Sequence, residues 1–207
     1  MKNIINIKIP RVPFYFVRHG QTDWNKENKV MGQIDIPLNA IGLQQAQTVA
    51  KNIAQLKISH IVSSPLKRAM QTSEIIAAVM NKPITVIDEL TQNALGVLEG
   101  RSKTELLYGA TIDNLIEHWK KGGDIESVEH WLDFVSRITI GLNSALAINA
   151  DGKPVLIVAH KPVYWVLLHI LRAKVVEENA KNCGVYFFRP PDLDTNEWLV
   201  SVLGEED

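Results

Sequence analysis

Cysteine is almost absent from this sequence of 207 residues. The one cysteine, Cys183, excludes a disulfide bond within the chain and favours the reducing environment of the cytoplasm. Because Cys183 precedes Gly184 and an apolar run, we expect it to pack inertly against its neighbours rather than to act as a nucleophile.

Long hydrophobic runs are also missing. No stretch approaches the roughly 18 apolar residues that a membrane span needs. The first ten residues mix isoleucines with Asn3, Asn6 and Lys8, so they lack the continuous apolar stretch of a signal peptide. We therefore expect no membrane partner and a cytoplasmic location.

The sequence also lacks an excess of basic or of acidic residues. The chain has 22 basic and 23 acidic side chains, whereas nucleic-acid-binding proteins and proteins of anionic membranes usually carry a basic excess. Hydrophobic residues make up 46% of the chain, which is enough for a packed core. No repeat or linker divides the sequence, so a single domain over residues 1–207 is expected, with no nucleic-acid partner.

Short apolar runs recur along the chain and predict strands. Because consecutive residues are apolar, the strands are expected to be buried on both faces of a sheet. Four of them lie at residues 14–17, 60–62, 84–87 and 155–159. Two more, at 185–188 and 198–202, are expected to form a hairpin through a turn at 190–196.

Apolar residues at three-to-four spacing predict helices near residues 43–54, 66–80, 127–146 and 162–171. Ser127 is the expected N-cap of the third helix. Strands that alternate with helices predict an α/β three-layer sandwich, in which a mainly parallel sheet has helices on both faces. A helical excursion at about 102–133 would lie over one edge.

Basic side chains follow three of the predicted strands. Arg18 and His19 follow the first strand, Arg68 comes shortly after the second, and His160 and Lys161 follow the fourth. The carboxyl ends of parallel strands meet at one edge of a sheet, where ligands bind. Each residue alone has an ordinary structural interpretation. Together they predict an anion pocket, because a multiply charged anion offsets the repulsion between gathered cations.

The sequence FVRHGQTDWN at 16–25 resembles the signature of the histidine phosphatase superfamily, which includes the cofactor-dependent phosphoglycerate mutases. The likeness continues between 32 and 46, through SSPLKRAMQT at 63–72, and at 96–100 and 158–160. The matches span most of the chain in the expected order.

The resemblance implies that His19 is a nucleophile that becomes transiently phosphorylated, and that Arg18, Arg68 and His160 bind the phosphoryl oxygens. Asn25 is similar to a further phosphate contact. Positioned charge is what a loose phosphoryl transition state needs, so neither a metal nor another cofactor is expected.

Two more residues of the signature are candidates for substrate binding, Gly20 and Thr22. A glycine directly after the nucleophile would let the backbone approach the oxyanion closely. An ordinary turn glycine is the alternative interpretation of Gly20.

Two positions depart from the family pattern. Gln92 stands where the family commonly has a proton-donating glutamate, and an amide can hydrogen-bond a leaving oxygen but cannot protonate it. Glu89 and Glu99 are candidate replacements, although Glu99 matches a family glutamate that is more often structural. After the second histidine, where many relatives have glycines, Lys161 either adds positive charge to the pocket or points to solvent.

Three hypotheses remain open. The first is a phosphomonoester hydrolase that acts on a small phosphorylated substrate through a phosphohistidine on His19. The second is a phosphatase for good leaving groups, such as phosphohistidine or phosphoanhydrides. The third is a weakened module that binds phosphorylated ligands and turns them over poorly. A mutase is disfavoured because mutases of this type are longer and hold off water. The final strand pair offers an edge that would suit a homodimer.

Overall fold

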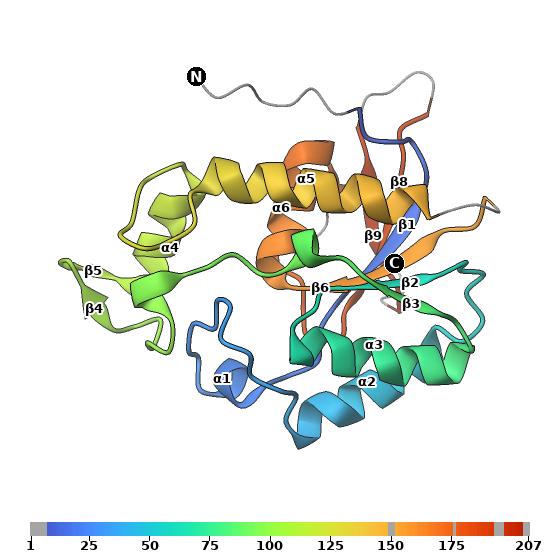
Figure 1. Cartoon of the computed structure of the whole chain (residues 1–207), viewed down its shortest axis with the longest axis horizontal. Coiled ribbons are helices and arrows are strands. Elements are labelled where there is room, and N and C mark those ends of the chain that lie inside the picture. Colours follow the sequence, from blue (N-terminus) through green and yellow to red (C-terminus); the bar gives the residue numbers. More distant parts are fainter. Residues whose placement is uncertain (1–7, 149–151, 176, 193–196, 205–207) are drawn as a thin grey trace.

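The computed structural model describes residues 8–148, 152–175, 177–192 and 197–204. Within these ranges, seven strands form one sheet in the order β3-β2-β6-β1-β8-β9-β7 (Figure 1). Their bounds are β1 Phe14–Arg18, β2 Ile61–Ser63, β3 Ile84–Val86, β6 Val155–Ala159, β7 Lys174–Val175, β8 Val185–Arg189 and β9 Leu199–Val202. Four of the six pairings are parallel, while β8 runs antiparallel to both β1 and β9.

The last two predicted strands do pair as antiparallel neighbours, β8 with β9. Residues 193–196, part of the turn expected between these strands, lie outside the described residues. Residues 1–7, part of the N-terminal stretch that was compared with a signal peptide, also lie outside them. None of the helices in the described ranges is long and apolar enough to span a bilayer.

The sheet is covered by helices on both faces, as predicted (Figure 1). On one face lie α2 and α3, and on the other lie α5 and α6. The helices are α1 Asp23–Lys26, α2 Ala40–Asn52, α3 Lys67–Met80, α4 Ile112–Lys120, α5 Trp131–Ala147 and α6 Lys161–Leu171. All five residues of β6 are buried, and they alternate between the two cores. A continuous apolar run is therefore what this central strand requires.

The prediction that Ser127 caps a helix was wrong. The helix α5 begins at Trp131, and its N-cap is His130, whose Nδ1 accepts the N–H of Leu132 at 3.2 Å. Ser127 instead has a positive φ of 59° and accepts the N–H of Val97 through its Oγ. Its hydroxyl thus ties one loop to another rather than opening a helix.

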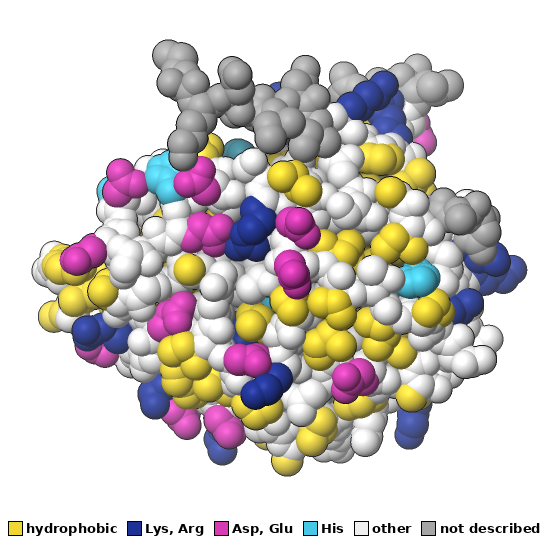
Figure 2. All heavy atoms as spheres, in the orientation of Figure 1, with side chains coloured by type: hydrophobic (Ala, Val, Ile, Leu, Met, Phe, Trp, Pro, Cys, Tyr) yellow, Lys and Arg dark blue, Asp and Glu magenta, His cyan; other side chains and the backbone are white. Residues whose placement is uncertain are grey.

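The expected helical excursion at 102–133 contains α4, but it also contains a two-stranded sheet of β4 (Leu106–Leu107) and β5 (Ala110–Thr111). These elements extend to one side of the main sheet (Figure 1). Figure 2 shows basic and acidic side chains interspersed among apolar ones on the face that it draws.

Candidate active site

Three neighbouring strands, β2, β6 and β1, end at the same edge of the sheet and carry the predicted site residues. The backbone N–H of His19, directly after β1, donates to the carbonyl of Ala159 at 3.0 Å. The N–H of Ser64, directly after β2, donates to the carbonyl of Val158 at the same distance. The parallel ladder therefore places the segments that carry Arg18, His19 and His160 side by side, as the sequence predicted.

His19 has a defined tautomer. Its Nδ1 lies 2.7 Å from the carbonyl oxygen of Gly20, and because a carbonyl only accepts, Nδ1 carries the hydrogen. The other ring nitrogen, Nε2, then keeps its lone pair. Burial, followed by the positive charges of Arg68 and Arg18, lowers the pKa of His19 well below its usual value. The imidazole is therefore neutral and able to attack an electrophile through Nε2.

Two guanidinium groups lie near His19, that of the partly buried Arg18 and that of the fully buried Arg68. Arg18 Nη1 donates to the carbonyl of Ala180 at 2.8 Å, and Arg68 donates to the carbonyls of Gly32 and Ile34 at 2.8 and 2.9 Å. The Nε of each arginine is buried and has no hydrogen-bond partner in the described part of the chain. Burial lowers the pKa of both to about 10, so both stay charged at neutral pH.

His160 supplies a third unpartnered nitrogen. Its Nε2 lies 2.8 Å from Ser64 Oγ, its ring centroid lies 5.2 Å from that of His19, and its buried Nδ1 has no partner among the described residues. Burial, together with Arg68 and His19, lowers the pKa of His160. In the tautomer in which the Ser64 hydroxyl donates to Nε2, Nδ1 carries the hydrogen and is a free N–H donor. Arg18, Arg68 and His160 thus each have one buried nitrogen without a hydrogen-bond acceptor among the described residues.

A cavity of about 480 Å³ opens onto this cluster. Arg18, His19, Asn25, Gln92 and Lys161 border it, whereas the fully buried Arg68 and His160 are not part of its lining. The cavity exceeds what a phosphate group needs, so it has room for the rest of a phosphorylated molecule. An anion whose oxygens accept from the unpartnered N–H groups would satisfy donors that are costly to leave buried and unpaired.

Gly20 and Thr22 lie outside the cavity lining. The N–H of Gly20 donates to Thr72 Oγ1 at 3.1 Å, and a Cβ on Gly20 would meet the carbonyl oxygen of Gly42 at 2.6 Å. The structure thus favours the packing interpretation of Gly20, since its backbone presses against the start of α2. Thr22 caps α1, because its Oγ1 accepts the N–H of Asn25 at 3.1 Å.

Sequence reasoning missed Asn182. Its Nδ2 donates to the carbonyl of His19 at 2.8 Å and to Asn25 Oδ1 at 3.3 Å, and so it holds both segments in place. Asn93, Lys103 and Trp165 also border the cavity and were missed. Nothing in the residue pattern singled them out. Asn93, Lys103 and Asn182 lie in loops, and Trp165 lies within α6, where its apolar ring matches the helical pattern of a core residue.

The acid replacement candidates do not border the cavity. Glu99 Oε1 accepts the backbone N–H groups of Gln33 and Leu95 at 3.0 and 2.9 Å, a structural role as expected. Glu89 is also absent from the cavity lining. Gln92 does border it, and its Oε1 accepts from Arg68 Nη2 at 3.0 Å.

Lys161 borders the cavity instead of extending into solvent. Its Nζ lies 4.9 Å from the ring centroid of Trp165, whose ring also has Lys120 Nζ at 4.5 Å. Burial, followed by Lys103 and Arg18, lowers the pKa of Lys161 to about 8. Of the two interpretations, the structure favours added positive charge in the pocket.

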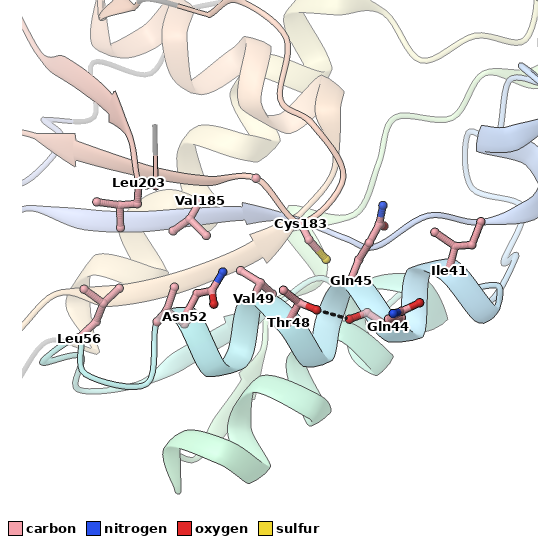
Figure 3. Close-up of a pocket in the computed structure, with 13 residues that line it drawn as sticks. Ile41, Gln44, Gln45, Thr48, Val49, Asn52, Leu56, Cys183, Val185 and Leu203 are labelled. Atoms are coloured by element: carbon pink, nitrogen blue, oxygen red, sulfur yellow. Dashed lines mark hydrogen bonds between the residues drawn. The ribbon is translucent and has the colours of Figure 1, made fainter. Parts of the chain in front are cut away.

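A second cavity, of about 680 Å³, lies between α2 and the β8–β9 side of the sheet (Figure 3). Aliphatic, amide and hydroxyl side chains line it, and Cys183 lies at its wall. Burial raises the pKa of the Cys183 thiol to about 12, which keeps it protonated and unreactive. This larger cavity has no ionisable side chain other than the thiol in its lining, so the chemistry belongs to the smaller one.

The family model described as "Histidine phosphatase superfamily (branch 1)" matches residues 14–192, and the chain belongs to that superfamily. Two curated relatives carry the name "Probable phosphoglycerate mutase GpmB". The Proteus mirabilis protein is 32% identical, with 92% of each chain covered. The Yersinia pestis protein is 35% identical, with 90% of this chain and 87% of the relative covered.

Solved structures share the fold. A mycobacterial glucosyl-3-phosphoglycerate phosphatase superposes with a TM-score of 0.77 at 22% identity, covering 94% of this chain and 99% of that one. The α-ribazole phosphatase from Shigella flexneri has a TM-score of 0.74 at 19% identity, covering 94% and 96%. The α/β sandwich predicted from the sequence is therefore the fold of known histidine phosphatases.

Proposed function

We propose that the protein is a phosphomonoester hydrolase that works through a phosphohistidine on His19. The observation that carries this proposal is the set of three buried, unpartnered N–H donors on Arg18, Arg68 and His160 beside a neutral imidazole with a free Nε2. These donors complement the equatorial oxygens of a phosphoryl group in transfer. Asn25 lies at the wall of the same cavity, which supports a contact between its side chain and the substrate.

The reaction has two steps. His19 Nε2 attacks phosphorus, the bond from phosphorus to the ester oxygen breaks, and the alkoxide leaves with a proton taken from solvent or a nearby acid. Water then attacks phosphorus, the P–N bond breaks, and inorganic phosphate leaves while one proton goes to solvent. The positive charges of Arg18 and Arg68 stabilise both transition states, and Nδ1–H of His19 keeps its bond to Gly20 throughout.

Gln92 favours substrates whose leaving groups need little protonation. By the resemblance to the family, its amide stands where the acid is commonly found, and an amide cannot donate a proton to a leaving oxygen as a carboxylic acid does. Phosphohistidine, phosphoanhydrides and aryl phosphates fit this condition, so they form the second candidate substrate class.

The covalent intermediate is the direct test of this function. The protein is mixed with p-nitrophenyl phosphate, quenched in alkali, and its phosphoryl content is mapped by mass spectrometry. We expect one alkali-stable, acid-labile phosphoryl group on His19, together with release of inorganic phosphate. A modified residue elsewhere, or none under turnover, would contradict the proposal.

A mutase makes the same phosphoenzyme but a different product. The GpmB relatives are about as long as this chain, so chain length does not separate the two activities. With phosphoglycerate as substrate, a hydrolase releases inorganic phosphate, whereas a mutase interconverts the 2- and 3-isomers and releases almost none.

The charge of Lys161 is expected to affect substrate binding near neutral pH. Its ammonium group is charged below about pH 8 and loses its charge as the pH rises through that value. Lys103, Lys120, Arg18 and Asp113 are the charged groups that act on it. The KM for phosphoglycolate, which has a second anionic group, should therefore rise above about pH 8, while that for ethyl phosphate should change little.

Substitutions at position 161 separate charge from size. Lys161→Met should raise the KM for phosphoglycolate on the order of tenfold below about pH 8, because one charge-assisted contact is lost. Lys161→Arg keeps its charge across this range, so its KM should stay level through pH 8. A wild-type KM that does not change with pH would contradict a binding role for Lys161.

A further inference from the structure

The side-chain amide of Asn93 is a feature of the cavity that the proposed reaction does not use. Asn93 borders the cavity that contains His19, and its exposed fraction is 0%. Its Nδ2 donor and its Oδ1 acceptor both lack a hydrogen-bond partner in the described part of the chain. An unsatisfied buried polar group is destabilising, and here both ends of one amide are unsatisfied.

The backbone around Asn93 is held on both sides. Gln33 Nε2 donates to the carbonyl of Gln92 at 3.0 Å, and the N–H of Ala94 donates to Glu129 Oε2 at 3.2 Å. This anchoring leaves the buried side chain little freedom to turn toward bulk water. The cavity that Asn93 borders is therefore the nearest space from which a hydrogen-bonding partner can approach the amide.

The chemistry of the amide indicates what that partner is. Asn93 offers a donor and an acceptor side by side, and a hydroxyl group can satisfy both because it also donates and accepts. A phosphoryl dianion offers only acceptors and would leave Oδ1 unpaired. The phosphoryl oxygens also have their own complement in the free N–H groups of Arg18, Arg68 and His160. The amide is therefore suited to the alcohol part of a substrate.

We propose that Asn93 is a specificity-determining residue that selects phosphate esters whose alcohol carries a free hydroxyl group. This inference rests on the proposed phosphatase reaction at His19, because the ester is placed there by its phosphoryl group. An alkyl chain of the same size would leave both ends of the amide unpaired. Sites that hydrogen-bond a substrate hydroxyl reject analogues without it strongly, by up to about 10⁵-fold.

The test compares glycerol 3-phosphate with 2-methylbutyl phosphate, in which methyl groups replace both hydroxyls at the same heavy-atom count. We expect the unaltered protein to favour glycerol 3-phosphate in kcat/KM by at least about 100-fold. Asn93→Leu, which keeps the side-chain size, should reduce this ratio by at least about tenfold. The ratio cancels any general loss of activity, so a purely structural role would not change it.

Asn52→Leu is the matched control, because Asn52 borders the second cavity instead. Asn93→Ser serves if the leucine variant does not fold. Binding of the same two esters to His19→Ala protein, measured by calorimetry, gives the preference without turnover. If the unaltered protein hydrolyses neither ester but the His19→Ala variant binds them with this preference, the proposed function is overturned and the selectivity of Asn93 is not. A ratio that is equal in the unaltered, Asn93→Leu and Asn52→Leu proteins would overturn the proposed selectivity.

Discussion

Replacing His19 with alanine is expected to lower kcat for p-nitrophenyl phosphate by at least about 10⁴-fold, because the attacking atom itself is removed. The positive charges of Arg18 and Arg68 remain in this variant and can still stabilise direct attack by water. A small residual rate is therefore expected, without any phosphoryl group on the protein. Steady-state kinetics combined with the alkali-quenched mass measurement checks both points.

His60 provides the matched control for this substitution. It is a partly buried histidine just before β2, and its Nε2 bonds Thr85 Oγ1 at 2.8 Å. Because it precedes β2, it lies at the edge of the sheet opposite His19. His60→Ala should keep a kcat close to that of the unaltered protein. If both variants lost activity equally, the loss would reflect folding, and if His19→Ala stayed active, the nucleophile would have to be another group.

Restoring a carboxyl group with Gln92→Glu is expected to raise the hydrolysis of alkyl phosphates by about 10²–10⁴-fold, the usual contribution of general acid catalysis. Aryl phosphates should gain much less, because their leaving groups need no proton. The measurement is kcat/KM for a series of phosphate esters, plotted against the pKa of the leaving alcohol for the unaltered protein and for Gln92→Glu. A new proton donor makes kcat/KM depend less steeply on that pKa.

The gain should depend on pH in a defined direction. Arg68 Nη2 lies 3.0 Å from the Oε1 of Gln92, so a carboxylate at this position would face a guanidinium that lowers its pKa. Only the protonated acid can donate, so the gain should be largest at low pH and shrink as the pH rises. Gln44→Glu, on the exposed side of α2, adds the same charge elsewhere and should give no gain. No gain for Gln92→Glu at any pH would mean that position 92 does not reach the leaving oxygen.

The layered fold was predictable because its central strands are buried on both faces. In β6 every residue from Val155 to Ala159 packs against one of the two cores, which produces the uninterrupted apolar run that was recognised. The start of α5 was not predictable from the same kind of pattern. Val128 also packs against the cores, and its spacing from Trp131 imitates helical periodicity although it lies in a loop.

The residues of the candidate site likewise fall into a predictable and an unpredictable group. Arg18 is the last residue of β1, and His19 and His160 directly follow the parallel strands β1 and β6, so topology alone brings them to one edge. Asn182 instead reaches the site through the antiparallel pairing of β8 with β1, and Asn93 reaches it from a loop. Neither arrangement produces a periodic pattern in the sequence. Tertiary contacts of this kind become visible only once the backbone has been placed.

The contact from Asn182 to His19 also bears on how the protein is made. The two residues are 163 positions apart, and Asn182 is brought in by the pairing of β8 with β1. A ribosome releases His19 and its signature motif early, when most of the chain has yet to be synthesised. The carbonyl of His19 can be held only after β8 has emerged and docked, so a nascent or C-terminally shortened chain would carry the whole motif and still lack an assembled centre.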